Sequence, residues 1–102
     1  MCDGKLDGTA TGTVLVENEK TRVTEWQFPA RGDNTGWHTH EFDYVVVPLF
    51  TGQLEMSEPN KAPFKADLTE GVPYFRRRGV EHDVANGNDF ECAFIEIEFF
   101  AP

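Results

Sequence analysis

The sequence predicts an all-β domain, an antiparallel barrel or sandwich, and three observations predict it. Short segments rich in β-branched and aromatic residues recur along the chain, turn residues separate them, and no segment carries a long helical stripe of apolar residues. Regular turn signals between short strands are typical of sandwiches and barrels. The chain has 102 residues, which is the size of one domain with one core.

The elements of the first half follow from residue type and alternation. Residues 1–13 are rich in Gly, Thr and Asp, so we interpret them as an N-terminal arm or short edge strand and residues 14–102 as the domain. Thr24, Trp26 and Phe28 alternate with Val23, Glu25 and Gln27, which predicts a strand with two different faces. Extended segments are also predicted at 14–16, 37–40 and 44–50, with a loop at 29–36.

The second half continues the same pattern. Extended segments are predicted at 53–56, 64–68, 72–75 and 90–100, the last being the longest. Gly, Pro, Asn and Asp predict turns between them, at 51–52, 57–63, 70–71, 79–82 and 86–89.

The charge of the chain limits its partners. With 9 basic and 18 acidic side chains the net charge is −9, whereas nucleic-acid binding needs clustered Lys and Arg. The longest apolar stretch, residues 44–50, is far shorter than the roughly 20 residues of a membrane span. The first residues lack the pattern of a signal peptide, and two Cys make no disulfide framework. We therefore expect a cytoplasmic protein without nucleic-acid or membrane partners, whose strand edges are covered in a homodimer.

The three histidines predict a metal site. His38 and His40 are separated by one residue, and in a strand such side chains project from the same face, so both imidazoles can reach one ion. His82 is the third candidate ligand, distant in sequence as is usual in mononuclear sites. The alternative is that these histidines are ordinary core residues, because a His-x-His pair on its own also arises by chance.

Glycine spacing makes the histidine pattern more specific. Gly32 lies six positions before His38, and Gly71 and Gly79 precede His82, with Asn86 four positions after it. This order and spacing closely resemble the two signature motifs of the cupin family. Phrases at 16–19, 36–38, 43–48, 71–76, 79–82 and 94–98 further resemble a group of small bacterial single-domain cupins, some of them named β-alanine degradation proteins.

The resemblance implies a double-stranded β-helix that holds one divalent ion, Fe, Mn, Ni or Zn, on His38, His40 and His82. The first family motif also carries a Glu where this chain has Tyr44 or Val45. Tyr44 is the preferred fourth ligand or catalytic group, through its phenol, and Asp43 is the alternative. A core position for Tyr44, a turn position for Asp43 and a site of three histidines alone also remain open.

Other residues are candidates for handling a substrate. Arg76 lies within the matched second motif and can bind a carboxylate, with a surface ion pair as the alternative. Glu96 alternates with Ile95 and Ile97 and is a candidate catalytic base or partner of the ligands, unless it faces solvent. Trp26 and Phe28 are candidate substrate contacts within a set of aromatic residues that line either a pocket or the core: Trp26, Phe28, Trp37, Tyr74, Phe75 and Phe94.

Two classes of function follow from these residues. The first is a metal-dependent, dioxygenase-like enzyme that acts on a small carboxylic acid or an amino-acid-derived metabolite. The second is a non-enzymatic cupin that binds or senses a small molecule on its metal. The fold does not decide between them, because cupins host both classes. Both classes predict a small-molecule ligand, with a small carboxylate as the expected one.

Overall fold

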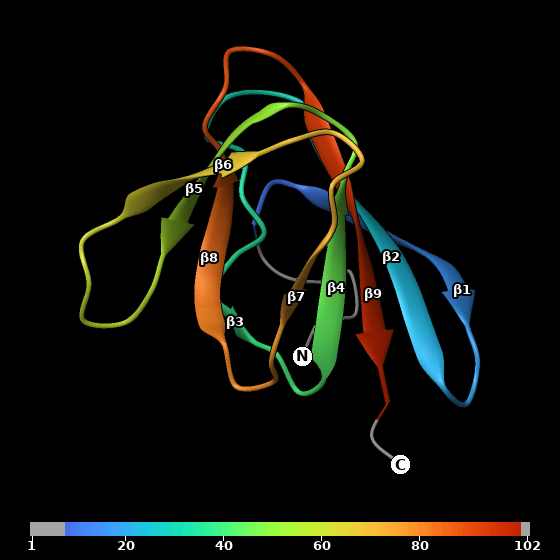
Figure 1. The fold of residues 1–102 in the computed structure, drawn as a ribbon. Helices are drawn as coiled ribbons and strands as arrows, with labels where there is room; N and C mark the ends of the chain where they lie inside the picture. Colours follow the sequence, from blue (N-terminus) through green and yellow to red (C-terminus); the bar gives the residue numbers. More distant parts are fainter. Residues whose placement is uncertain (1–7, 101–102) are drawn as a thin grey trace.

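The computed structural model describes residues 8–100 and builds them from strands and turns (Figure 1). Within these residues there is no helix, which agrees with the all-β prediction and leaves no helix that could span a membrane. The strands are β1 (Thr11–Glu17), β2 (Thr21–Phe28), β3 (His38–Thr39), β4 (Asp43–Pro48), β5 (Gly52–Ser57), β6 (Phe64–Leu68), β7 (Tyr74–Arg76), β8 (Glu81–Asn86) and β9 (Cys92–Phe99).

Two antiparallel sheets enclose the interior. One has the strand order β1-β2-β9-β4-β7 and the other β3-β8-β5-β6. From β2 onward the chain crosses repeatedly from one sheet to the other, so β4, β7 and β9 alternate along the sequence with strands of the smaller sheet. Figure 1 shows the result, with β5 and β8 on one side of the interior and β4 and β9 on the other. This winding is the double-stranded β-helix that the sequence motifs imply.

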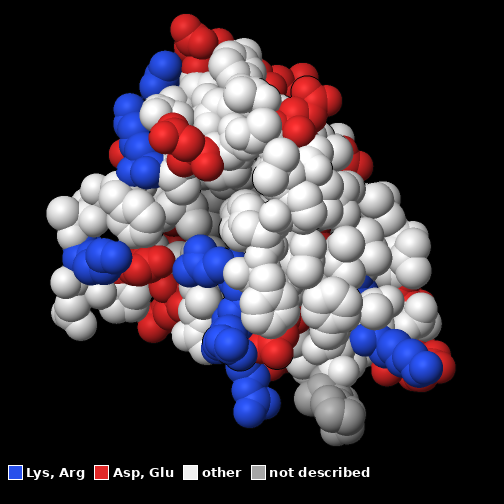
Figure 2. Space-filling model, in the orientation of Figure 1, with Lys and Arg blue, Asp and Glu red and all other residues white. Residues whose placement is uncertain are grey.

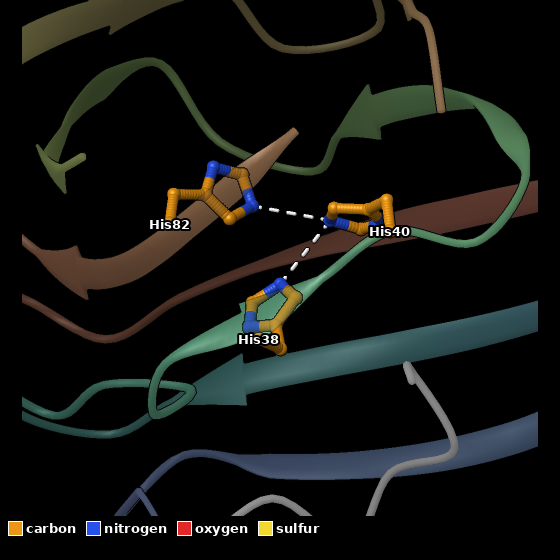
Figure 3. A group of neighbouring side chains, drawn as sticks. All are labelled: His38, His40 and His82. Atoms are coloured by element: carbon orange, nitrogen blue, oxygen red, sulfur yellow. Dashed lines mark hydrogen bonds between the residues drawn. The ribbon is translucent and has the colours of Figure 1, made fainter. Parts of the chain in front are cut away.

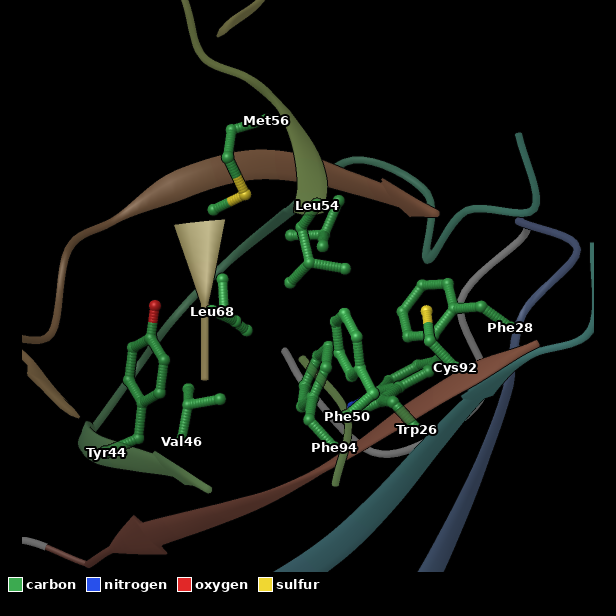
Figure 4. Close-up of a cluster of buried hydrophobic side chains, with 11 residues drawn as sticks. Trp26, Phe28, Tyr44, Val46, Phe50, Leu54, Met56, Leu68, Cys92 and Phe94 are labelled. Atoms are coloured by element: carbon green, nitrogen blue, oxygen red, sulfur yellow. The ribbon is translucent and has the colours of Figure 1, made fainter. Parts of the chain in front are cut away.

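The hydrophobic core lies between the two sheets. In β2 the alternation predicted from the sequence is confirmed, because Thr24, Trp26 and Phe28 are buried. The rings of Phe28 and Phe94 pack 5.5 Å apart, an ordinary separation for an aromatic pair. Figure 4 shows this cluster, whose members are Trp26, Phe28, Tyr44, Val46, Phe50, Leu54, Met56, Leu68, Val84, Cys92 and Phe94.

One strand was not predicted. Residues 79–82 and 86–89 were expected to be turns, but Glu81–Asn86 forms β8, which pairs with both β3 and β5. Its inward positions are His82, Val84 and Asn86, so only one of them is hydrophobic. Asn86 is buried because its side-chain amide donates hydrogen bonds to the carbonyls of Phe28 and Phe90, at 3.1 and 2.9 Å. A strand with this polar interior face lacks the usual apolar alternation.

Two further expectations differ from the structure. Trp37 and Phe75, which were grouped with the core and pocket aromatics, are each 51% exposed. They adjoin inward-facing neighbours, so strand alternation directs them outward. The first segment agrees with one of its two interpretations: β1 begins at Thr11, so residues 11–13 belong to an edge strand, while residues 1–7 lie outside the described residues.

Candidate metal centre

The fold brings the three histidines together from two adjacent strands. His38 in β3 is the direct cross-strand partner of His82 in β8. His40 follows β3, where its N–H donates to the carbonyl of Val80 at 2.9 Å and its carbonyl accepts from Gly79 N–H at 2.8 Å. All three side chains are buried. Figure 3 shows their rings converging on one point inside the barrel.

The separations of the histidine nitrogens suit a shared metal ion. Nε2 of His40 lies 3.1 Å from Nε2 of His38 and 3.1 Å from Nε2 of His82. Two nitrogens bound to one ion at ~2.1 Å and near a right angle are separated by about 3 Å. The three Nε2 atoms all lie within 4.8 Å of one another. The group can therefore hold a single ion.

Hydrogen bonding and burial put the imidazoles in the form that binds metal. Nδ1 of His38 lies 2.8 Å from the carbonyl oxygen of Gly36, so Nδ1 carries the proton and Nε2 presents its lone pair to the centre. Burial lowers the pKa of His40 to about 2 and that of His82 to about 3, with further lowering from the neighbouring histidines. Burial also lowers the pKa of His38. At neutral pH these residues are uncharged, as metal ligation requires.

A cation would also stabilise the nitrogen lone pairs that meet in this cluster. Neutral imidazoles whose Nε2 lone pairs point at one another cannot all be satisfied by hydrogen bonds among themselves. The donor set therefore fits a divalent ion such as Fe, Mn, Ni or Zn, all of which accept imidazole ligands.

Two carboxylates of β9 border the histidines. Glu96 and Glu98 are 4% and 1% exposed, so both face the interior, and the solvent-facing alternative for Glu96 is wrong. Arg22 pairs with Glu98, with 2.7 Å between Nε and Oε1. Oε2 of Glu96 lies 3.9 Å from Nε2 of His40. Burial, and next the charge of Glu98, raise the pKa of Glu96 to about 8.

Tyr44 and Asp43 occupy different environments. Tyr44 is buried, and its ring stacks on the imidazole of His40 with the ring centroids 3.8 Å apart. Its hydroxyl points from β4 into the interior (Figure 4). Oδ1 of Asp43 instead accepts a hydrogen bond of 2.8 Å from the backbone N–H of Arg78. That bond ties the start of β4 to the turn after β7, as the turn interpretation of Asp43 predicts.

An enclosed cavity adjoins the histidines. Its free volume is ≈ 20 Å³, and it is lined by Trp26, Thr35, His38, Tyr44, Val46, Leu54, Met56, Tyr74, Arg76, His82, Val84, Phe94 and Glu96. Of the two aromatic residues expected to contact a substrate, Trp26 lines this cavity, whereas Phe28 lies in the core and is not among the lining residues. The wall is largely apolar, with few polar groups, which is typical of small-molecule sites.

Arg76 lies where the cavity meets the surface. Its side chain is 32% exposed and pairs with Glu58 at 3.8 Å. It borders both the cavity and an outer groove between β6 and β7. Figure 2 shows basic side chains gathered near the turn between β7 and β8, with acidic ones beside them. Arg76 is thus a cation within reach of both solvent and the interior.

Some residues that shape the site were missed in the sequence. The hydroxyl of Thr35 lies 3.5 Å from Nδ1 of His38 and accepts the backbone N–H of Val84 at 3.2 Å. Asp83 accepts the N–H of Gly36 at 3.1 Å, which fixes the carbonyl that orients His38. Arg22 neutralises Glu98 from β2. These contacts join loops and strands far apart in sequence, and only Gly36 had a signal, as part of a matched phrase.

Comparison with known proteins agrees with this architecture, although no family model matches the chain. A curated protein of Pseudomonas aeruginosa, the beta-alanine degradation protein BauB, is 47% identical over 89 residues, which are 87% of this chain and 92% of BauB. The crystal structure of a cupin domain from Bordetella pertussis is 50% identical, with a TM-score of 0.86 over 90% of this chain and 94% of that one.

A more distant structure has the same fold. A cupin with a double-stranded β-helix from Methanocaldococcus jannaschii superimposes with a TM-score of 0.72 at 18% identity, over 97% of this chain and 84% of that one. The fold and the buried histidine cluster together define a cupin. Within the cupin family, this chain belongs to the group of small single-domain proteins that includes BauB.

Proposed function

We propose that this protein binds one divalent metal ion through His38, His40 and His82, and that it is a metal-dependent, dioxygenase-like enzyme acting on a small carboxylic acid or amino-acid-derived metabolite. The observation that carries the proposal is the convergence of three buried Nε2 atoms, two of the pairs 3.1 Å apart, beside a cavity that His38 and His82 line. An ion held by three histidines keeps further positions open, where it can polarise a carbonyl or take up O2.

The expected ligand follows from the charge of the site. The protein carries a net charge of −9, so an anion is attracted only by a focused positive centre. The ion and Arg76 supply that centre, and a guanidinium binds a carboxylate with two parallel hydrogen bonds. Trp26 contributes part of the apolar wall. BauB is named for β-alanine degradation, so β-alanine and related β-amino acids are the first small acids to test.

Tyr44 and Glu96 are the side chains that can move a proton beside the histidines. Without an ion in the site, the pKa of Glu96 is raised to about 8, so this group is protonated at neutral pH and can act as an acid. Once ionised, it can act as a base. Tyr44 can donate a hydrogen bond from its phenol. These roles require both groups to face the same cavity, and both line it.

A non-enzymatic protein that binds or senses a metabolite is the second candidate. The free volume of the cavity, ≈ 20 Å³, is far below the range of about 300–1,000 Å³ for ligand pockets, so only a very small ligand fits unless side chains move. A site this small and enclosed suits retention of a small ligand as well as turnover.

The test begins with metal analysis of protein purified without added metal, followed by an oxygen-uptake screen on small acids. Thermal melts of the metal-loaded protein then identify ligands. A ligand at 100 times its Kd that binds only the native state stabilises it by about 2.7 kcal/mol. Arg76→Gln should abolish the stabilisation by acids, whereas Arg77→Gln, whose guanidinium lies over the exposed Phe75 ring, is the matched control. Ligand binding without O2 uptake or product favours the second candidate.

A further inference from the structure

The interior near the histidines contains a carboxyl group that the rest of the protein satisfies only in part. Glu96 is 4% exposed, and its Oε1 has no hydrogen-bond partner among the described residues. Burying a carboxyl group without full hydrogen bonding is costly. β9 could have placed a hydrophobic residue here, since Phe94 two positions earlier faces the same interior and belongs to the core. A side-chain hydrogen bond with Trp26 reaches this carboxyl group, but its Oε1 is left for a further partner.

The neighbouring carboxylate is in a different situation. Glu98 is held by Arg22, with 2.7 Å between Nε and Oε1, a short charge-assisted contact that balances its charge. For Glu96, the basic side chain within 4.0 Å among the described residues is His40, a residue whose burial disfavours a positive charge. Of the two acidic residues of β9, Glu96 is thus the one left to interact with a cation other than Arg22.

The carboxyl group of Glu96 lies beside one of the three histidines. Its Oε2 lies 3.9 Å from Nε2 of His40. Two donors on one ion, each at ~2.1 Å, can be at most about 4.2 Å apart, so this separation is compatible with an ion shared with His40. Glu96 groups with His40 and Glu98 rather than with His38 and His82, so an ion on the three histidines requires the Glu96 carboxylate to turn toward them. Glu96 comes from β9 of the larger sheet, opposite the sheet that carries β3 and β8. Its carboxylate therefore approaches the histidine cluster from the other wall of the barrel.

We propose that Glu96 is a direct carboxylate ligand of the metal ion, completing a site of three histidines and one carboxylate whose oxygen donor comes from the last strand. The proposal rests on metal binding by the histidines as proposed above. It assigns Glu96 to the metal itself, whereas Tyr44 stacks on a ligand. It also gives Glu98 and Arg22 the task of positioning, as a neutral pair beside the ligating carboxylate.

Titration with Co²⁺ tests the assignment, because the visible absorption of Co²⁺ reports its ligands independently of any activity. Glu96→Gln keeps the shape of the side chain and removes the charge. It should raise the Kd for Co²⁺ on the order of 100-fold and change the absorption spectrum. Glu25→Gln is the matched control, since Glu25 is the outward-facing cross-strand partner of Ile95 and its substitution should alter neither quantity.

Each other result has a defined meaning. An unchanged Kd and spectrum in Glu96→Gln overturn the proposal. So does a raised Kd with an unchanged spectrum, which makes Glu96 a positioning residue. A spectral change in Tyr44→Phe but not in Glu96→Gln also overturns it. If the unsubstituted protein and Glu25→Gln bind no Co²⁺, metal binding itself fails. Should Glu96→Gln not fold by circular dichroism, a crystal structure of the Co²⁺-loaded unsubstituted protein decides whether a Glu96 oxygen or another atom is bonded to the ion.

Discussion

The ring of Tyr44 lies nearly parallel to the imidazole of His40, with 3.8 Å between centroids and 15° between planes. This stack joins β4 of one sheet to the segment that follows β3 of the other. An imidazole with an aromatic ring on one face has little freedom to rotate. Tyr44 therefore has a structural role at the site that does not depend on its hydroxyl group.

Substitutions of Tyr44 separate the ring from the phenol. Tyr44→Phe should keep the stack and most of the metal affinity, whereas Tyr44→Leu should lose the aromatic contact, which is worth about 0.5–1.5 kcal/mol, and weaken metal binding. Isothermal titration with Zn²⁺ measures both. A loss of affinity in Tyr44→Phe as large as in Tyr44→Leu would show that the phenol oxygen is a ligand, as the motif spacing predicts.

His82 tests whether the second motif belongs to the metal site. His82→Ala should reduce metal occupancy sharply, because it removes one of three nitrogen donors and leaves a gap in β8. Glu81→Gln, an exposed neighbour on the same strand, should leave occupancy unchanged. Metal content after purification, measured by mass spectrometry, provides the comparison. Full occupancy in His82→Ala would mean that His38 and His40 bind the ion without the second motif.

Acid should destabilise the metal-free protein through its histidines. The pKa of His40 is lowered from 6.5 to about 2, and that of His82 from 6.5 to about 3. Below about pH 6.5 the unfolded chain therefore binds protons that the folded chain does not. The free energy of unfolding should fall as the pH drops, by about 1.4 kcal/mol per pH unit for each such residue.

Urea denaturation between pH 7 and pH 5, in the presence of a chelator, measures this slope. His82→Gln should flatten it, because one buried imidazole no longer titrates in the unfolded state. An identical slope in both proteins would contradict the prediction. Glu96 affects the free energy of unfolding in the opposite direction. Its pKa is raised from 4.5 to about 8, so its contribution to stability is largest below pH 4.5 and is lost as the pH rises through 8.

The edge strand β1 supports the expectation of a homodimer. Val14, Leu15 and Val16 are 39%, 51% and 50% exposed, and β1 lies at the edge of its sheet. An apolar strand at a sheet edge is prone to pair with another chain. Sedimentation at micromolar concentrations should give a dimer, and Val16→Lys should shift it toward monomer, while Val72→Lys at a different exposed position should not. A monomer in the unsubstituted protein would count against the expectation.

Sequence reasoning succeeded where local patterns record the structure directly. Alternation in residues 21–28 identified β2 and its buried face, and the spacing of glycines and histidines located His38, His40 and His82. It failed for β8, where the inward residues His82 and Asn86 are polar because they serve the site and a buried hydrogen-bond network. A strand that carries function in this way has no hydrophobic pattern by which to be recognised.

The direction of Glu96 was the other point that the sequence left open. Alternation with Ile95 and Ile97 separates the two faces of β9 but does not say which face is inside. The hydrophobicity of the isoleucines favours an interior position for them, but in the structure Glu96 and Glu98 are the buried residues. Only the pairing of β9 with β2 and β4, through Thr24 and Val46 opposite Glu96, fixes the direction, and such pairings are not encoded in local sequence.

The direct pairing of His38 with His82 across two strands has a consequence for how the protein would acquire the proposed ion. The donors are held by the backbone ladder, so the pocket for the ion is assembled when the barrel folds and capture requires no further ordering of the chain. Small zinc-dependent domains behave differently, because they unfold when the metal is withdrawn. This cupin should instead release and regain its ion as a folded protein. The identity of the bound metal then reflects which ions are available and how fast each exchanges.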